Sequence, residues 1–159
     1  MAMPQRITAI TPFQKYLQDT MRADTTPTVG MMSLLATDPS NPEFDGVYVK
    51  APPKLVGGAP IARPFTLITS PTEIGLKYAF GRIANDNTQQ VDIFTSEQTT
   101  TDRLVAIYNR MLYLFDEKKP VIAGFRALRK TRVEFIGAFD DQDGGAHAIA
   151  MINPTLQVL

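Results

Sequence analysis

The sequence predicts an α+β domain in which two helices pack on one face of a small antiparallel or mixed β-sheet. Two segments, 11–23 and 99–115, carry apolar residues at helical spacing, and several short runs rich in β-branched and aromatic residues end at prolines or turn residues. No linker, internal repeat or low-complexity segment divides the 159 residues. We therefore expect residues 1–159 to form a single domain.

The first predicted helix begins at Thr11, which can cap a helix and is followed by Pro12, a residue that fits the first helical position. Gln14 lies three residues after the cap, as in a capping box. The apolar face of this helix consists of Phe13, Tyr16, Leu17 and Met21. We expect the helix to end near Ala23, because the ADTTPTVG segment after it is prone to turns.

The segment 27–60 is rich in proline, and within it only 47–49 (VYV) is predicted to be a strand. The rest of the segment is predicted to be ordered loop. Residues 65–69 (FTLIT) lie between two prolines and are typical of a strand. The sequence leaves residues 72–87 open between a hairpin arm and a long flexible loop, because glycines interrupt any periodic pattern there.

A strand followed by the best-patterned helix occupies the centre of the chain. Residues 89–95 alternate between apolar and polar side chains, as a half-buried strand does, and residues 99–102 resemble a capping box. The predicted sheet-facing side of the helix is Leu104, Tyr108, Met111, Leu112 and Phe115. Further apolar residues such as Val105 widen this arc, so we expect the helix to be covered on more than one side.

The remaining segments are predicted to be β structure: 121–128, 132–139 and 146–152. The last two should form a hairpin. The connection between them, 140–145, supplies aspartates and glycines that tolerate the positive φ angles of a longer hairpin loop.

Composition excludes several classes of function. Lys+Arg and Asp+Glu are balanced at 16 each, whereas a domain that binds nucleic acid tightly usually has a basic surplus. The chain has no cysteine, so a disulfide, a thiolate metal site and a cysteine nucleophile are impossible. Neither a signal peptide nor a stretch approaching the ~20 apolar residues of a membrane span is present. We expect a soluble cytoplasmic product.

Few residues suggest chemistry. His147 is the only histidine, and no nucleophile-elbow pattern accompanies it, so a structural role is favoured over a Ser-His-acid site. The acidic turn 140–143 lacks the ligand series and distal Glu of an EF-hand, which favours a solvated turn over a calcium loop. Glycine pairs at 57–58 and 144–145 lack a phosphate-binding frame. The sequence thus predicts no catalytic residue, no metal and no cofactor.

One local cluster of basic residues stands out. Its members are Arg126, Arg129, Lys130 and Arg132. The cluster could meet phosphate or an acidic partner surface. A solvated strand end is favoured, because charges that flank strands commonly protect sheet edges.

The order of these elements, and several short segments within them, resemble the tail terminator (tail completion) proteins of long-tailed bacteriophages. The matching segments are Gly46-Val47-Tyr48 followed by Ala51-Pro52, Arg63-Pro64-Phe65, Thr88 to Phe94 with Asp102-Arg103-Leu104, and the turn Asp143-Gly144-Gly145-Ala146-His147. The resemblance spans Thr11 to Asn153. The Pro-rich segment 37–60 is long for that family, which leaves the role of this loop open.

The resemblance implies a small α/β domain that assembles as a hexameric ring of identical subunits in the virion, at the junction of head and tail. Such a ring caps the completed tail tube and offers a joining surface to the head completion or connector protein, while DNA passes through the lumen without specific binding. It is assembled in the host cytoplasm. The resemblance implies no enzyme activity and no membrane partner. A closed ring of this kind requires two different contact surfaces on each subunit.

We expect the loops 37–60, 72–87 and 140–145 to be exposed and to contact partners. The candidate contact residues in them are Asp45, Tyr48, Lys77, Asn85, Asp140, Asp141 and Asp143. The first alternative is another head–tail joining or tail tube component, although tube proteins are dominated by strands and this chain has one strongly periodic helix. The second is a cytoplasmic enzyme or small-molecule binding domain, which would need a pocket with convergent polar groups.

Overall fold

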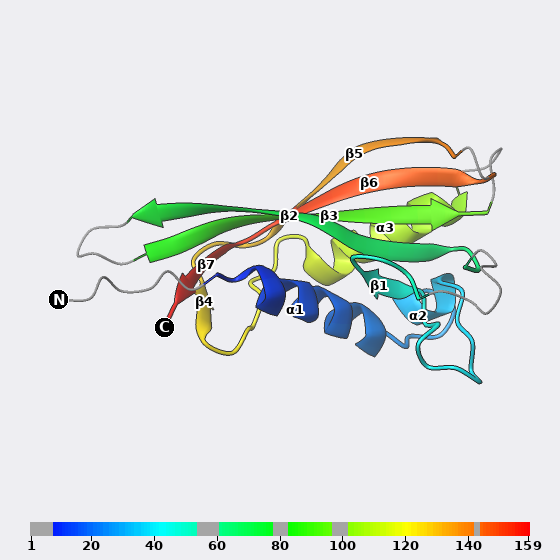
Figure 1. The fold of residues 1–159 in the computed structure, drawn as a ribbon, viewed down its shortest axis with the longest axis horizontal. Helices are drawn as coiled ribbons and strands as arrows, with labels where there is room; N and C mark the ends of the chain where they lie inside the picture. The colour runs from blue at the N-terminus through cyan, green and yellow to red at the C-terminus, as the bar shows by residue number, and fades with distance from the viewer. Residues whose placement is uncertain (1–7, 54–60, 78–82, 97–101, 142–143) are drawn as a thin grey trace.

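A computed structural model describes residues 8–53, 61–77, 83–96, 102–141 and 144–159, and it has the predicted α+β class. Seven strands form one mixed sheet, and three helices lie on one of its faces (Figure 1). The strand order is β1-β2-β3-β6-β5, with β7 paired to β3 and β4. The elements are α1 (Ile10–Ala23), α2 (Met31–Leu34), β1 (Val47–Val49), β2 (Phe65–Lys77), β3 (Ile83–Thr95), α3 (Asp102–Phe115), β4 (Phe125–Ala127), β5 (Arg132–Asp140), β6 (Ala146–Asn153) and β7 (Thr155–Val158).

Helix α1 has the apolar face that the sequence predicts. Phe13, Leu17 and Met21 are buried against the sheet, and the buried Gln14 amide donates a hydrogen bond to Gln89 of β3 at 3.0 Å. The predicted cap is wrong by two residues. The helix begins at Ile10 after Ala9, whose side chain cannot cap, so Thr11 lies inside the first turn.

Within the segment 72–87, residues 72–77 of β2 and 83–87 of β3 pair as hairpin arms, and residues 78–82 lie outside the described residues. The two strands pair antiparallel from Phe65 opposite Phe94 to Lys77 opposite Ile83, with an irregularity between Ile68 and Pro71. Strand β1 pairs in parallel only with residues 66–68 of β2. Pro71 is tolerated because, in the part of the chain that the structure describes, no other strand needs an amide from β2 at that position.

The carboxyl-terminal strands are mostly as predicted. The hairpin of β5 and β6 is confirmed, whereas the strand predicted at 121–128 is reduced to the three residues of β4. Strand β7 has no counterpart in the prediction. Pro154 ends β6, and β7 then pairs with residues 84–86 at the far end of β3 and with β4.

The buried side of α3 is rotated from the predicted one. Leu104, Ile107, Met111 and Phe115 are the fully buried side chains, at spacings of three and four residues. Tyr108 and Leu112, which we expected in the core, are only partly buried beside it. The residues of the predicted capping box that precede Asp102 lie outside the described residues.

Candidate interaction surfaces

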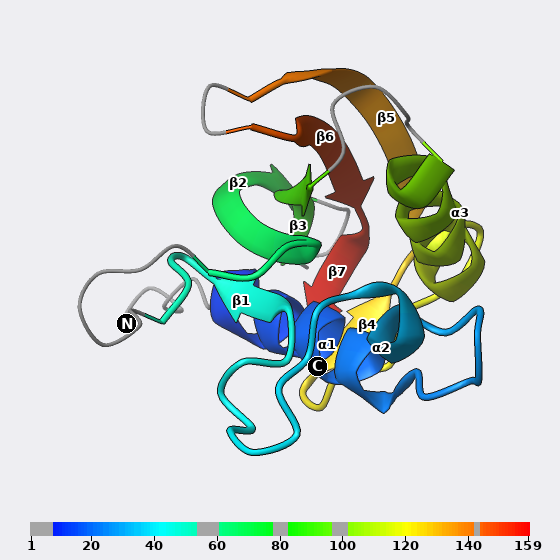
Figure 2. The same ribbon diagram turned by 90° about the vertical axis from the view of Figure 1, so that its right-hand side faces the viewer.

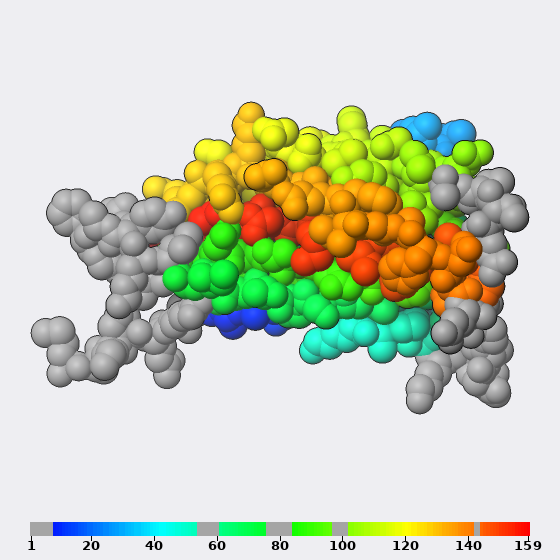
Figure 3. All heavy atoms as spheres, turned by 90° about the horizontal axis from the view of Figure 1, so that it is seen from above, coloured from blue at the N-terminus to red at the C-terminus, as the bar shows by residue number. Residues whose placement is uncertain are grey.

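The sheet has an outer face opposite the helices, and none of the described helices packs on it. Figure 3 looks onto this face, where β5, β6 and β3 lie side by side. Along β3, Val91 and Ile93 point into the core, so the alternate residues Asp92 and Phe94 belong to the outer face.

A row of aromatic rings crosses this outer face at one end of the strands. Tyr48 and Phe65 have ring centroids 5.8 Å apart, Phe65 and Phe94 4.7 Å, Phe94 and His147 4.3 Å, and His147 and Phe139 4.6 Å. The row joins five strands side by side. It stiffens the sheet, because cross-strand aromatic pairs each add stabilisation beyond their buried area.

His147 lies inside this row of rings. Its Nε2 is 3.6 Å from the Asp92 carboxylate, too long for a hydrogen bond, and has no hydrogen-bond partner among the described residues. Its closest ring neighbours are Phe94 and Phe139, which offer no nucleophile. The surroundings suit a packed aromatic side chain better than an acid–base catalyst.

Asp141, which follows β5, forms an ion pair with Arg63, which lies just before β2. Arg63 donates to Asp141 at 2.7 Å and to the Thr95 carbonyl at 3.3 Å, while its guanidinium lies 5.3 Å from the centre of the Phe94 ring. Gly145 has φ +103°, and a Cβ there would lie 1.9 Å from the Thr95 carbonyl oxygen. Only glycine fits this close approach.

Strand β5 ends the sheet and carries large apolar side chains in solvent. Phe135 is 44% exposed, Ile136 58% and Phe139 50%; we call these three residues the β5 apolar row. They do not share one face, because Phe135 packs against Tyr108 of α3 and Phe139 packs against His147 on the outer face. The register of β5 against β6 shifts between Phe135 and Gly137, which leaves Ile136 as the extra residue of a bulge. Bulges at sheet edges turn a side chain away from the regular pleat.

A second apolar surface lies between α2 and α3. A groove of about 380 Å³ opens there; we call it the α2–α3 groove. Its lining is mostly apolar and consists of Thr28, Val29, Leu34, Ala106, Asn109, Arg110 and Tyr113. Val29 and Tyr113 are 54% and 62% exposed, so the groove has apolar walls that reach the solvent.

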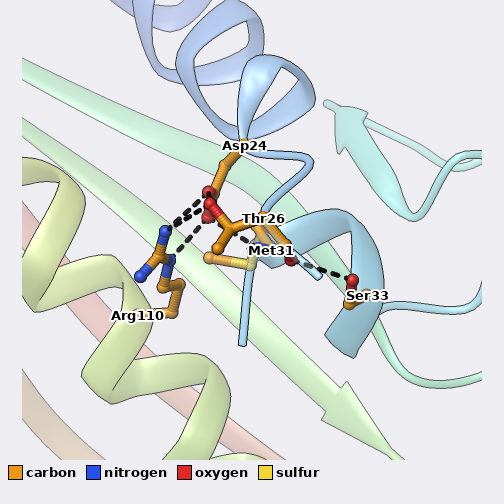
Figure 4. Close-up of polar contacts among 5 residues, drawn as sticks. All are labelled: Asp24, Thr26, Met31, Ser33 and Arg110. Carbon is orange, nitrogen blue, oxygen red and sulfur yellow. Dashed lines mark hydrogen bonds and ion pairs between the residues drawn. The ribbon is translucent and has the colours of Figure 1, made fainter. Parts of the chain in front are cut away.

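An ion pair holds this groove in shape (Figure 4). Arg110 of α3 donates two hydrogen bonds of 2.7 Å to the Asp24 carboxylate. The same carboxylate accepts a hydrogen bond of 2.6 Å from the Met31 amide, at the start of α2. Arg110 also donates to the Thr26 hydroxyl at 3.2 Å. The segment between α1 and α2 is thereby fixed to α3.

The electrostatics of Asp24 follow from these contacts. The Arg110 guanidinium lowers the pKa of Asp24 from 3.8 to about 2, against the opposing effect of burial, and the Met31 amide adds to the lowering. The carboxylate is therefore charged at neutral pH, and its role is to join two elements.

The predicted basic cluster is largely neutralised. Arg129 pairs with Asp86 at 2.7 Å, Arg132 with Glu134 at 3.2 Å, and Lys130 lies 3.9 Å from Glu117. These pairs at the strand ends agree with the interpretation as a solvated strand end rather than a phosphate site.

The predicted contact residues lie on different elements, and not all of them are exposed. Tyr48 is 4% exposed in β1 and Asn85 is fully buried in β3, so the expectation that they lie in exposed loops is wrong. Strand pairing explains the error, because it buries both positions. The other residues are placed as follows: Asp45 pairs with Arg22, Lys77 ends β2, Asp140 is exposed at the end of β5, Asp141 pairs with Arg63, and Asp143 lies outside the described residues.

Sequence reasoning missed both apolar surfaces. The signal for the α2–α3 groove was present in Tyr113, an aromatic residue that lines the groove, lies off the buried stripe of α3 and is 62% exposed. The described residues contain no group of three metal-ligating side chains, and no described helix has the length and hydropathy to cross a membrane.

The sequence matches no protein-family model and no curated protein. Among solved structures, the fold is similar to a chain of a particle described as "Virion of native gene transfer agent (GTA) particle". The TM-score is 0.70 at 12% identity, over 96% of this chain and 99% of that chain. The likeness establishes a shared fold over nearly the whole of both chains.

Proposed function

We propose that this protein is a structural subunit of a phage-like virion, and that it acts there as a tail terminator. One observation carries the proposal: the fold matches a chain of a gene transfer agent virion from end to end, at a TM-score of 0.70. We propose a structural role without enzyme activity, as the resemblance to the tail terminator family implies.

The finer role rests on the sequence resemblance and on the surfaces. A tail terminator forms a closed ring that ends growth of the tail tube and presents a joining surface to the head. Each subunit of a closed ring contacts its two neighbours through two different surfaces. Exposed apolar side chains on β5 and the α2–α3 groove, on different elements, support this proposal. We propose a hexamer, with the tail tube protein and the head completion or connector protein as partners.

Deletion of the gene from a phage that encodes it tests this role. The expected result is unjoined heads and tail tubes of uncontrolled length, observed by electron microscopy of the lysate. Tails of normal length that fail to join heads would instead favour another head–tail joining component, and a complete absence of tubes would favour a tube protein. Normal joined particles would contradict every virion role and return attention to an enzyme or a small-molecule binding domain.

A further inference from the structure

We propose that the ring closes by strand pairing, in which β5 of one subunit pairs antiparallel with the part of β2 that extends beyond β1 in a second copy of this chain. The two stretches are residues 134–140, which we call the β5 edge, and residues 71–77, which we call the β2 arm. The inference rests on the proposed function, because it names the residues of the ring contact. The contact is heterologous, since two different strands meet.

The β5 edge has no strand beside it in the part of the chain that the structure describes. Strand β5 pairs with β6 alone, and most of its side chains are exposed. The Val133 amide points away from β6 and donates to the Asp116 carboxylate at 3.0 Å. Val133 and Ala138 both lie opposite even-numbered residues of β6, so the alternation of an antiparallel ladder directs the Ala138 amide to the same edge. Such a row of backbone groups is a template for another strand.

The opposite end of the sheet is only partly covered. Strand β1 pairs with the first part of β2, and its Val47 carbonyl accepts hydrogen bonds from Gln18 and Arg22 of α1, at 3.3 Å and 3.4 Å. These side chains occupy the margin of β1 and hinder the addition of a strand there. The β2 arm continues beyond β1, and its Ile74 is 59% exposed. The β2 arm is therefore the part of this end that can accept a strand.

The directions of the strands suit a closed ring. The pairs β2–β3, β3–β6 and β6–β5 are all antiparallel, so β5 runs opposite to β2. Rotation about a ring axis that runs along the sheet preserves these directions from one copy to the next. The β5 edge of one copy therefore meets the β2 arm of its neighbour antiparallel, and each subunit uses opposite ends of its sheet toward its two neighbours.

The two stretches are offset along the strands, as Figure 1 shows. Through the ladder, Phe135 is level with Ile68 of β2, where β1 already pairs. A neighbour must therefore shift along the strands to bring its β2 arm beside the β5 edge, and a sheet that closes on itself requires such a stagger. The shift that sets Ile74 opposite Ile136 brings together two isoleucines that are 59% and 58% exposed.

Disulfide cross-linking tests this register, because the chain contains no cysteine. Ile74→Cys and Ile136→Cys are made as separate variants; both side chains are exposed, so both variants should fold. Oxidation of an equal mixture should give a disulfide-linked dimer, whereas each variant alone should stay monomeric under denaturing conditions. The double variant should give a ladder of cross-linked species that ends at the closed ring.

Lys15→Cys provides the control, because Lys15 is 72% exposed on α1 and belongs to neither stretch. Its mixture with Ile136→Cys should give about tenfold less dimer, since a disulfide forms only when the two Cα atoms come within about 7 Å. Dimer from Ile136→Cys alone would show that two β5 edges meet symmetrically and would overturn the inference. Absence of dimer from the test mixture, or equal yields in test and control, would overturn it as well.

A proline in the β5 edge tests the backbone contact itself. Ala138→Pro removes an amide that points away from β6, and proline is tolerated in edge strands, so the variant should keep its fold by circular dichroism. It should lose the ring-sized species in a native mass measurement, whereas Ala138→Val, which keeps the amide, should retain it. A ring of unchanged mass in folded Ala138→Pro would contradict strand pairing at this edge.

The cross-link and the gene deletion separate the two proposals. Unjoined heads and overlong tubes in the deletion strain, without the specific cross-link, would retain the terminator function and remove this contact. A specific cross-link in a protein whose deletion leaves phage tails normal would retain the contact and remove the terminator function.

Discussion

Strands β3 and β5 both carry large apolar side chains, yet Val91 and Ile93 of β3 are in the core and most of those of β5 reach the surface. Strand β3 pairs on both sides, with β2 and β6, and its Val91 and Ile93 are completely buried. Strand β5 pairs with β6 at the end of the sheet, and its apolar row stays 44–58% exposed. The difference shows that position in the sheet, which composition does not reveal, decides whether an apolar strand stabilises the fold or offers a binding surface.

Truncation of matched phenylalanines gives the largest expected contrast. Phe115 is 1% exposed in the core, so Phe115→Ala should lower the free energy of unfolding by about 3–5 kcal/mol through lost burial and a cavity. Phe139→Ala removes the same group from the half-exposed β5 row and should lower it by about 1 kcal/mol, the value of its ring contact with His147. Urea denaturation measures both; equal losses would contradict the contrast.

Loss of a buried charge should have the next largest effect. Arg110→Met leaves the 5%-exposed Asp24 carboxylate without its partner and should lower the free energy of unfolding by about 3 kcal/mol. Arg129→Met is the control, because the Arg129 side chain is 50% exposed beside Asp86 and its pair should contribute less than about 1 kcal/mol. Thermal unfolding of the two variants would show similar losses if the groove were not held by this pair.

The pH dependence of stability isolates the Asp24 carboxylate. Its pKa in the folded chain is about 2, below the ordinary 3.8, so its contribution is complete above pH 5 and is lost as the pH falls from about 4 to 2. The loss should be about 2 kcal/mol. Asp24→Asn should lack this component of the acid-induced loss, measured by urea denaturation at a series of pH values; an identical pH profile in both proteins would refute the assignment.

The smallest expected effect is at the bulge. Ile136→Ser should change the stability of the isolated chain by no more than about 0.5 kcal/mol, because the side chain is 58% exposed. Ile93→Ser, at a fully buried position of β3, should cost at least about 2 kcal/mol. A large loss for Ile136→Ser in calorimetry would mean that the β5 row supports the fold of a single chain.

The same contrast explains what the sequence could predict. Periodicity identified α1, α3 and the β5–β6 hairpin, because their patterns are local. It missed α2, a four-residue helix whose Met31 amide donates to the distant Asp24 that Arg110 also binds, and β7, which depends on pairing with the far end of β3. The buried side of α3 includes Ile107 in place of the predicted Leu112, because packing against the sheet selects the centre of a wide apolar arc.

The candidate site was harder to predict for a related reason. We assigned contacts to loops with turn residues, but whether a side chain is exposed depends on which strands pair. Pairing of β1 and β3 in the sheet buries Tyr48 and Asn85, while residues 132–139, predicted as an ordinary strand, form the edge of the sheet.

The Asp24 contact also determines how the helix α2 can open. The amide of Met31 donates to the same carboxylate that Arg110 binds, so release of that amide to solvent requires the carboxylate to move or the helix to detach. Hydrogen exchange at this single amide therefore reports how often the contact between Met31 and Asp24 opens. Slow exchange at Met31 beside fast exchange in the preceding turn would show that the groove is already rigid before any neighbour arrives.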